Sequence, residues 1–206
     1  NEMASIQKMM NADKKISEQL TPEEAKDLDK ILAEYGTTLK NVDSHSSAAL
    51  YSLVATKAVP CPQNEVKMYE IELLKTALKN KKTVSGLEKV DEQTYAISQA
   101  YDLKESILQL KQGNQYAVAV QKMAEAFKNE DLKQLDQLIK DPKFMNKRQE
   151  KLVLTDRNRN WAEKMPEIMK KQSSFFAVGS GHLWGDNGLI NLLKSKGYTV
   201  KPVSNL

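Results

Sequence analysis

The stretch that decides the expected fold is FFAVGSGHLWGDNGLINLLKSKGYTV, residues 175–200. It holds five of the eight glycines and one of the two histidines of the 206-residue chain. Aromatic and β-branched residues bounded by turns predict strands over residues 173–181 and 197–203. Between them, DNGLINLLKSKG (186–197) predicts a helix. Strand, Gly-rich turn, helix and strand in this order are typical of a βαβ unit with two parallel strands.

Most of the remaining chain shows helical periodicity. The clearest case is LTPEEAKDLDKILAEYG, in which Thr21 and Glu24 form a capping box pattern and Gly36 is placed to end the helix. Further amphipathic patterns end at Pro142, and Pro166 predicts a break or kink in a later helix.

These patterns together predict one domain over residues 1–206 of the α+β class, α/β-like in its C-terminal part. Helices are expected over about 1–80 and 91–170. KTVSGLE predicts a third strand over 82–88. The result is a small mixed sheet, including the C-terminal βαβ unit, with a large helical complement. Three strands are few for such a sheet, so we expect part of it to be missing from this chain.

Composition narrows the class of partner. The net charge is +4, and all but three of the 31 basic residues are lysines, spread along the helices among Asp and Glu. Arginine is the usual reader of phosphates and base edges, so a solvated surface explains this charge better than a nucleic-acid groove. No apolar run approaches the roughly 18 residues of a membrane span. We therefore expect neither a nucleic-acid partner nor a membrane span in this chain.

The GSGH turn is the first candidate site. A strand that ends at Val178 would place Gly179, Ser180, Gly181 and His182 at the C-terminal edge of the sheet, where ligands bind in open α/β folds. The glycines allow close backbone approach, and His182 is a candidate metal ligand or general base. The alternative is a plain turn, with His182 capping the following helix.

Two further stretches carry candidate residues. Glu88 follows a predicted strand, so a carboxylate and the His182 imidazole at strand ends can share a metal ion or act as an acid–base pair. In TDRNRNWAEKM, Arg157 and Trp161 share a helix face and Asn158 lies beside them. Arg157 can clamp a carboxylate, orient Glu88, or only stack on Trp161.

The other reactive side chains are weaker candidates. His45 lies in a polar loop and lacks the GxxH spacing, so it is expected to be a surface histidine. Cys61 stands between two prolines with no base beside it, so it is expected to be inert.

Three stretches resemble one family in the same order: VSGLEKVDEQ, LTDRNRNWAEKM and FFAVGSGHLWGDNGLINLLKSKGYTVKPV. The chain resembles the TraB/GumN family, which is related to the Tiki metalloproteases and more loosely to the haem-binding ChaN and erythromycin-esterase folds. The resemblance is best over about 65–206. It implies an extracytoplasmic bacterial protein, secreted or anchored to the membrane through a leader before Asn1.

The resemblance also implies a site. The Tiki branch uses two GxxH motifs and a glutamate to hold a metal ion. The second GxxH falls on Gly179 and His182, the glutamate falls on Glu88, and Arg157 and Asn158 match a polar pair near the cleft. The first GxxH has no counterpart and is expected upstream of Asn1, so the metal site is expected to be incomplete in this chain.

Three hypotheses follow. The first is a metal-dependent hydrolase that acts on peptides, in which His182 and Glu88 hold a divalent ion that activates water and Arg157 positions the substrate or the glutamate. The second is a non-catalytic module in which the helical portion caps a pocket for a peptide, haem or another small ligand, and His182 is an axial or hydrogen-bonding group. Gly179, Gly181 and Asn158 are the candidate binding residues of the site. The third is a purely structural domain. An oligomer, if one forms, is expected to use an exposed sheet edge.

Overall fold

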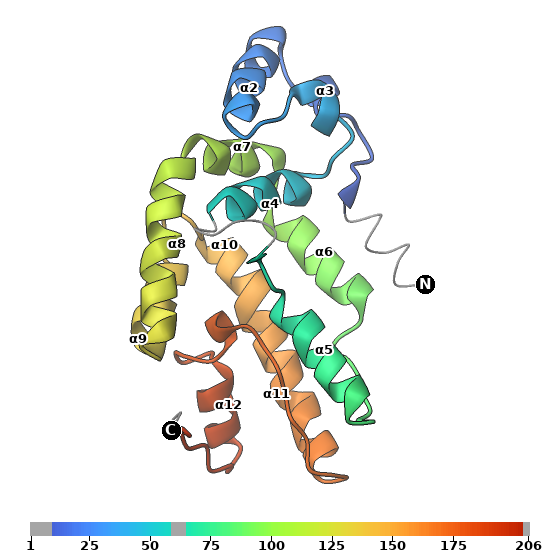
Figure 1. Ribbon diagram of the computed structural model, residues 1–206, viewed down its shortest axis with the longest axis vertical. Helices are drawn as coiled ribbons and strands as arrows, with labels where there is room; N and C mark the ends of the chain where they lie inside the picture. Colours follow the sequence, from blue (N-terminus) through green and yellow to red (C-terminus); the bar gives the residue numbers. More distant parts are fainter. Residues whose placement is uncertain (1–9, 59–64, 204–206) are drawn as a thin grey trace.

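The computed structural model describes residues 10–58 and 65–203 and shows a helical protein (Figure 1). In chain order the elements are η1 (Ser17–Gln19), α2 (Pro22–Glu34), α3 (Leu39–Val42), α4 (Ser47–Ala58), α5 (Tyr69–Lys79), α6 (Val90–Ala100), α7 (Leu103–Lys111), α8 (Gly113–Lys128), α9 (Leu132–Ile139), α10 (Lys147–Glu150), η3 (Lys151–Thr155), α11 (Asp156–Met169), η4 (Ser180–His182) and α12 (Leu189–Ser195). None of the helices in the described ranges combines the length and the apolarity that a membrane crossing requires.

Local sequence signals account for the first long helix. The Thr21 side chain accepts from the Glu24 amide at 3.3 Å, and the Glu24 carboxylate accepts from the Thr21 amide at 2.8 Å, which confirms the predicted capping box. Gly36 has a φ of +72°, the left-handed conformation that glycine adopts without steric cost, and α2 ends just before it.

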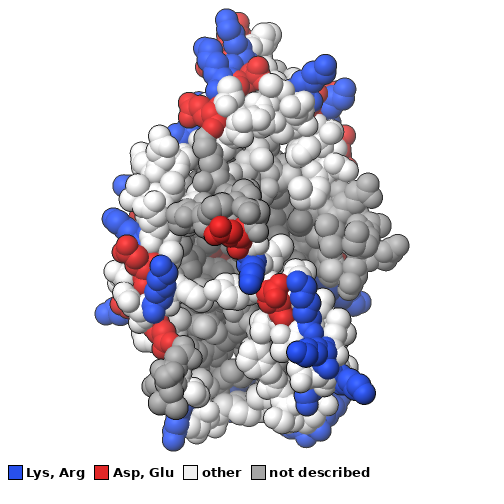
Figure 2. All heavy atoms as spheres, in the orientation of Figure 1, with Lys and Arg blue, Asp and Glu red and all other residues white. Residues whose placement is uncertain are grey.

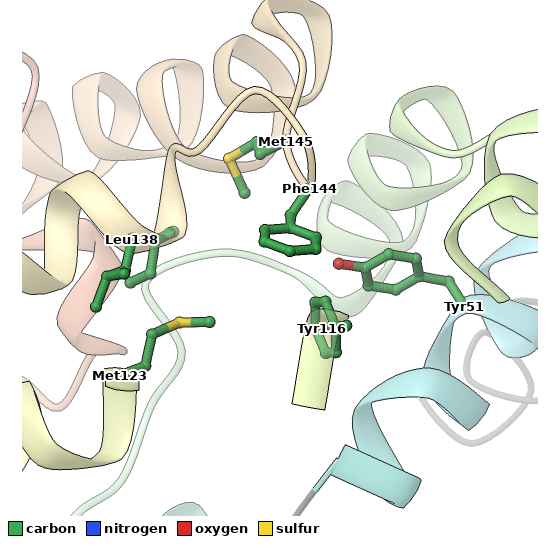
Figure 3. Close-up of a pocket in the computed structure, with 7 residues that line it drawn as sticks. Tyr51, Tyr116, Met123, Leu138, Phe144 and Met145 are labelled. Carbon is green, nitrogen blue, oxygen red and sulfur yellow. The ribbon is translucent and has the colours of Figure 1, made fainter. Parts of the chain in front are cut away.

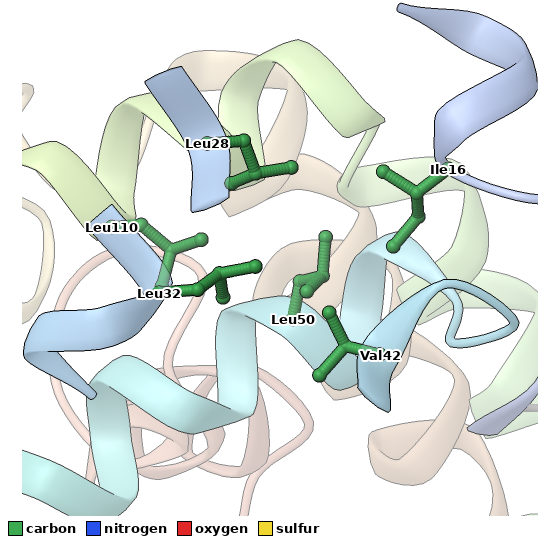
Figure 4. Close-up of a cluster of buried hydrophobic side chains, with 6 residues drawn as sticks. All are labelled: Ile16, Leu28, Leu32, Val42, Leu50 and Leu110. Atoms are coloured by element: carbon green, nitrogen blue, oxygen red, sulfur yellow. The ribbon is translucent and has the colours of Figure 1, made fainter. Parts of the chain in front are cut away.

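The N-terminal half of the molecule surrounds its own hydrophobic core. Leu28 and Leu32 of α2 pack with Leu50 of α4 and Leu110 of α7 (Figure 4). Ile16 and Val42 close the cluster from the chain segments beside these helices. Complete burial of such side chains contributes about 1.5–3 kcal/mol each, so this cluster holds α2, α4 and α7 together.

A second core lies on the other side of the molecule, along α11. Trp161, Ala162 and Met165 of this helix pack against Leu189 of α12, with Leu87, Phe176 and Val178 around them. The helix continues through Pro166 to Met169, so of the predicted break or kink at this proline the break is wrong. The second core fixes the loop around Leu87 and the segment after α11 onto one helix face, and this arrangement positions the site.

The predicted sheet is absent from the described residues, so the α+β class with a small mixed sheet is wrong. Residues 82–88, 173–179 and 197–203 have no strand assignment; the last two run as irregular segments on either side of α12 (Figure 1). Within the described ranges, β-type pairing is limited to an isolated antiparallel bridge between Asn11 and His45.

The apolar pattern of these segments explains why strands were predicted for them. Burial alternates along residues 174–180, with Phe176 and Val178 turned towards the second core and Phe175 82% exposed. Period-two apolar patterning predicts an extended segment lying on a core, but a strand also needs a neighbouring backbone for its hydrogen bonds. No such neighbour lies beside these segments in the described part of the chain, and the sheet edge expected to mediate oligomer contacts is therefore not present there.

Candidate functional site

One face of α11 supplies half of the candidate site. Asn158, Trp161 and Met165 recur at helical spacing and are buried, while Arg157 lies next to Asn158 and one turn before Trp161. The five residues before this helix, Lys151–Thr155, form a π-helical turn. Such turns interrupt regular helical bonding, and here the Val153 carbonyl accepts from Arg157 Nη1 at 3.0 Å. The turn therefore orients the arginine.

Glu88 reaches this helix from a loop before α6. Leu87 packs into the second core, and its carbonyl accepts from Lys164 Nζ of α11 at 2.9 Å. These two contacts hold the loop against α11. The Glu88 carboxylate consequently faces the arginine of α11.

Glu88 and Arg157 form a two-pronged ion pair. Arg157 Nη2 donates to Glu88 Oε1 at 2.7 Å, and Arg157 Nε lies 3.1 Å from Glu88 Oε2. The Trp161 indole N–H also donates to Glu88 Oε2, at 3.3 Å. Both side chains are mostly buried, at 12% and 15% exposure. A paired arginine fork with an added indole donor gives the carboxylate one defined orientation.

The guanidinium also lies over the Trp161 ring, with its Cζ 4.7 Å from the ring centroid. The structure thus shows both contacts that the sequence offered as alternatives for Arg157, the pairing with Glu88 and the stacking on Trp161.

His182 is held by Asn158 through two contacts. The Asn158 amide group donates to the carbonyl of His182 at 3.3 Å and to the carbonyl of Asn187 at 2.8 Å. The other side of this amide, Oδ1, lies 2.6 Å from His182 Nδ1. Because an amide oxygen only accepts, Nδ1 carries the proton and Nε2 keeps a free lone pair.

The environment keeps this imidazole neutral. Burial, and then the positive charge of Arg157, lower the pKa of His182 to about 4. The side chain is 8% exposed, and its ring stacks at a tilt against Trp161, with 4.6 Å between the ring centroids. At neutral pH His182 therefore presents an uncharged nitrogen. Only this form of the imidazole can coordinate a metal ion or accept a proton.

The lone pair of His182 and the carboxylate of Glu88 converge on one cation. Arg157 Nη1 lies 3.5 Å from His182 Nε2 while the same guanidinium binds Glu88. An imidazole nitrogen and a carboxylate are suitable ligands for a divalent metal ion, so this donor pair fits such an ion in ligand type and in charge. In this arrangement the guanidinium takes the place between them.

Two donors are fewer than the three protein ligands of a usual catalytic metal site. Among the residues that the structure describes, no group of three or more His, Cys, Asp and Glu side chains is placed to hold a metal ion.

The glycines of GSGH have different surroundings. A Cβ atom on Gly181 would lie 3.1 Å from Ile139 Cδ1, so this glycine permits close packing against α9. A Cβ atom on Gly179 would approach nothing nearer than His182 Cδ2, at 3.8 Å. His182 lies in η4 and does not cap α12, whose N-cap is Gly188.

The structure thus brings the predicted residues Glu88, Arg157, Asn158 and His182 into contact around Trp161. Sequence reasoning missed Asn187, which accepts from Asn158 through its carbonyl and from Arg159 through its side-chain oxygen. It also missed the π-helical turn. Neither has a signal in a single sequence, because Asn187 occupies an ordinary turn position and π-helical turns have no residue signature.

The remaining reactive side chains lie elsewhere. His45 belongs to the bridge with Asn11 beside the N-terminal core. Cys61 lies outside the described residues.

Two apolar cavities have linings that contain none of these polar groups. One, of about 90 Å³, lies between α4, α8, α9 and the Phe144 loop, with the Tyr51 hydroxyl directed towards Phe144 (Figure 3). The other, of about 170 Å³, is lined by Met165 of α11, by residues of α12 and by Phe176 and Val178. Pockets that enclose drug-sized ligands measure about 300–1,000 Å³, so the polar cluster is the stronger candidate site.

Comparison with known proteins identifies a family. A family model described as the TraB/PrgY/gumN family matches residues 1–202. Searches of curated proteins and of solved structures gave no match.

Proposed function

We propose that this chain, which belongs to the TraB/PrgY/gumN family, carries part of the site of a metal-dependent hydrolase that acts on peptide bonds. The observation that supports this proposal is that His182 Nε2 and the Glu88 carboxylate both face one cation, the Arg157 guanidinium. The resemblance to the Tiki branch supports the same residues. It also supports an extracytoplasmic location, which we include in the proposal.

His182 and Glu88 would hold the metal ion, and Asn158 would keep the imidazole in the tautomer that leaves Nε2 free. A divalent ion held by these residues would supply Lewis-acid activation of a water molecule near neutral pH. The neutral state of His182 avoids competition between a proton and the ion.

Arg157 would change partners when the ion is bound. Its guanidinium now neutralises Glu88, and a cation in that position repels it. Released from Glu88, the fork would keep its present contact with the Val153 carbonyl and would present N–H donors beside His182. Donors in this position stabilise negative charge that develops on a peptide carbonyl oxygen.

The test is hydrolysis of a mixture of unstructured peptides, with product detection by mass spectrometry. The full-length protein is assayed with Zn²⁺ or Mn²⁺ and again with a chelator. We expect metal-dependent cleavage that falls at least about a hundredfold in His182→Ala and in Glu88→Gln.

The matched control is His45→Ala, which removes the other histidine and should leave cleavage unchanged. Equal cleavage with chelator, or in His182→Ala, would refute the proposal. Binding of a peptide without cleavage under all metal conditions would instead favour the ligand-binding alternative.

A further inference from the structure

Helix α5 presents an apolar stripe that the described part of the chain leaves uncovered. It lies at the edge of the molecule (Figure 1) and has no buried side chain. Ile71, Leu74 and Leu78 are 43%, 40% and 63% exposed. Their spacing of i, i+3 and i+7 places them along one helix face. An exposed apolar stripe of this kind marks an interaction site.

A charged row runs beside the stripe and changes sign along the helix. Glu72, Lys75 and Lys79 have the same spacing one residue further on, so they lie parallel to the apolar side chains. Acidic residues occupy the first turn of α5 and a lysine occupies the last. Figure 2 shows the surface of the molecule in the same orientation as Figure 1, with basic side chains gathered over the C-terminal part of α5.

We propose that this face of α5 binds the same face of a second copy of the chain, with the two helices antiparallel. A two-fold axis near Leu74 places Ile71 of each copy against the partner's Leu78 and brings the two Leu74 side chains together. In the charged row, Glu72 of each copy then faces the partner's Lys79.

The charge pattern selects a second copy over other partners. A two-fold interface needs a surface that is complementary to itself, and a helix face that is acidic at its start and basic at its end has this property only in the antiparallel orientation. The two Lys75 side chains lie nearest the axis. Each already pairs with Glu72 of its own helix at 2.8 Å, which offsets their mutual repulsion.

The interface is expected to be weak. The 11 residues of α5 span only about 16 Å, and stable dimers bury more surface than one such stripe provides. We therefore expect a monomer–dimer equilibrium that depends on concentration.

The first test is sedimentation velocity over a broad concentration range, with the unmodified protein and Leu74→Glu. The substitution places two carboxylates at the two-fold axis, so the dimer dissociation constant should rise at least about tenfold. Leu108→Glu is the control, because Leu108 is also exposed (51%) but lies on α7. It should dimerise like the unmodified protein, and circular dichroism confirms that both variants fold.

The second test uses Glu72→Lys and Lys79→Glu. Each variant alone has like charges across the interface and should dimerise more weakly. Mixed together, they form a heterodimer in which both facing pairs have opposite charges, so association should return. Because no chain carries both substitutions, effects within one helix cannot produce this rescue.

An unmodified protein that is monomeric at all concentrations would overturn the proposal. So would a dimer that Leu74→Glu leaves intact, or the absence of association in the mixture.

Discussion

At the scale of single residues, Asn158 controls the chemistry of His182. Its amide group is committed to two carbonyls, those of His182 and Asn187, so its oxygen must face the ring and Nδ1 must hold the proton. Sequence alone placed Asn158 beside Arg157 and named both residues as candidates. It could not give the tautomer, because the tautomer depends on the carbonyl of Asn187, far along the chain.

The buried neutral state of His182 gives a prediction about stability and pH. The pKa of this imidazole is about 4 in the folded protein, against about 6.5 for an unfolded histidine. Between these values the unfolded chain binds more protons, so the free energy of unfolding falls as pH drops from about 6.5 to about 4 and is unaffected by this group below that. The loss should be about 3 kcal/mol.

Urea unfolding at a series of pH values, with chelator present, measures this effect. The unmodified protein should lose more stability over this range than His182→Gln, which has no imidazole to titrate. The variant His45→Gln should keep the slope of the unmodified protein. Identical slopes in the unmodified protein and His182→Gln would show that His182 is not buried in its neutral form.

At the scale of elements, the loop from Gly179 to Gly188 delivers His182 to α11. Among its glycines, Gly179 and Gly181 of GSGH were predicted from the sequence to serve the site. Gly188 differs from these two glycines in its surroundings. A Cβ atom on Gly188 would lie 2.3 Å from the carbonyl oxygen of Trp184 and 2.5 Å from that of Leu183. Such a clash requires the backbone to move.

We predict that Gly188→Ala lowers the free energy of unfolding by about 1–3 kcal/mol, because the neighbouring Asn187 must shift away from Asn158. Gly179→Ala should change it by no more than about 0.5 kcal/mol, since φ is −59° and space is available. Chemical denaturation of the two variants compares them directly, and equal losses would contradict this assignment.

Some elements followed closely from local sequence. The capping box and Gly36 fixed both ends of α2. Pro166 did not break α11. Trp161 and Met165, which precede it by more than one turn and by one residue, anchor the helix in the second core. Local propensity is overridden where tertiary packing is strong.

At the scale of the whole molecule, the large helical complement was predicted correctly, whereas the sheet that was also predicted is absent from the described residues. Two of the three segments predicted as strands border the candidate site: Glu88 ends one, and His182 directly follows another. Apolar residues of these two segments contact the second core. Such contacts occur in extended loops as well as in strands. The pattern therefore marked segments that lie against the second core, but the secondary structure predicted for them is wrong.

We propose that His182 and Glu88 can hold a cation and that the Arg157 guanidinium occupies its place in this structure. The most direct measurement is Zn²⁺ binding by isothermal titration calorimetry, with the unmodified protein, His182→Ala and Arg157→Gln. Circular dichroism verifies that each variant is folded. We predict binding by the unmodified protein, loss of that binding in His182→Ala, and tighter binding in Arg157→Gln, where no guanidinium competes for Glu88. Binding that His182→Ala leaves unchanged, or no binding by any of the three proteins, would contradict the claim.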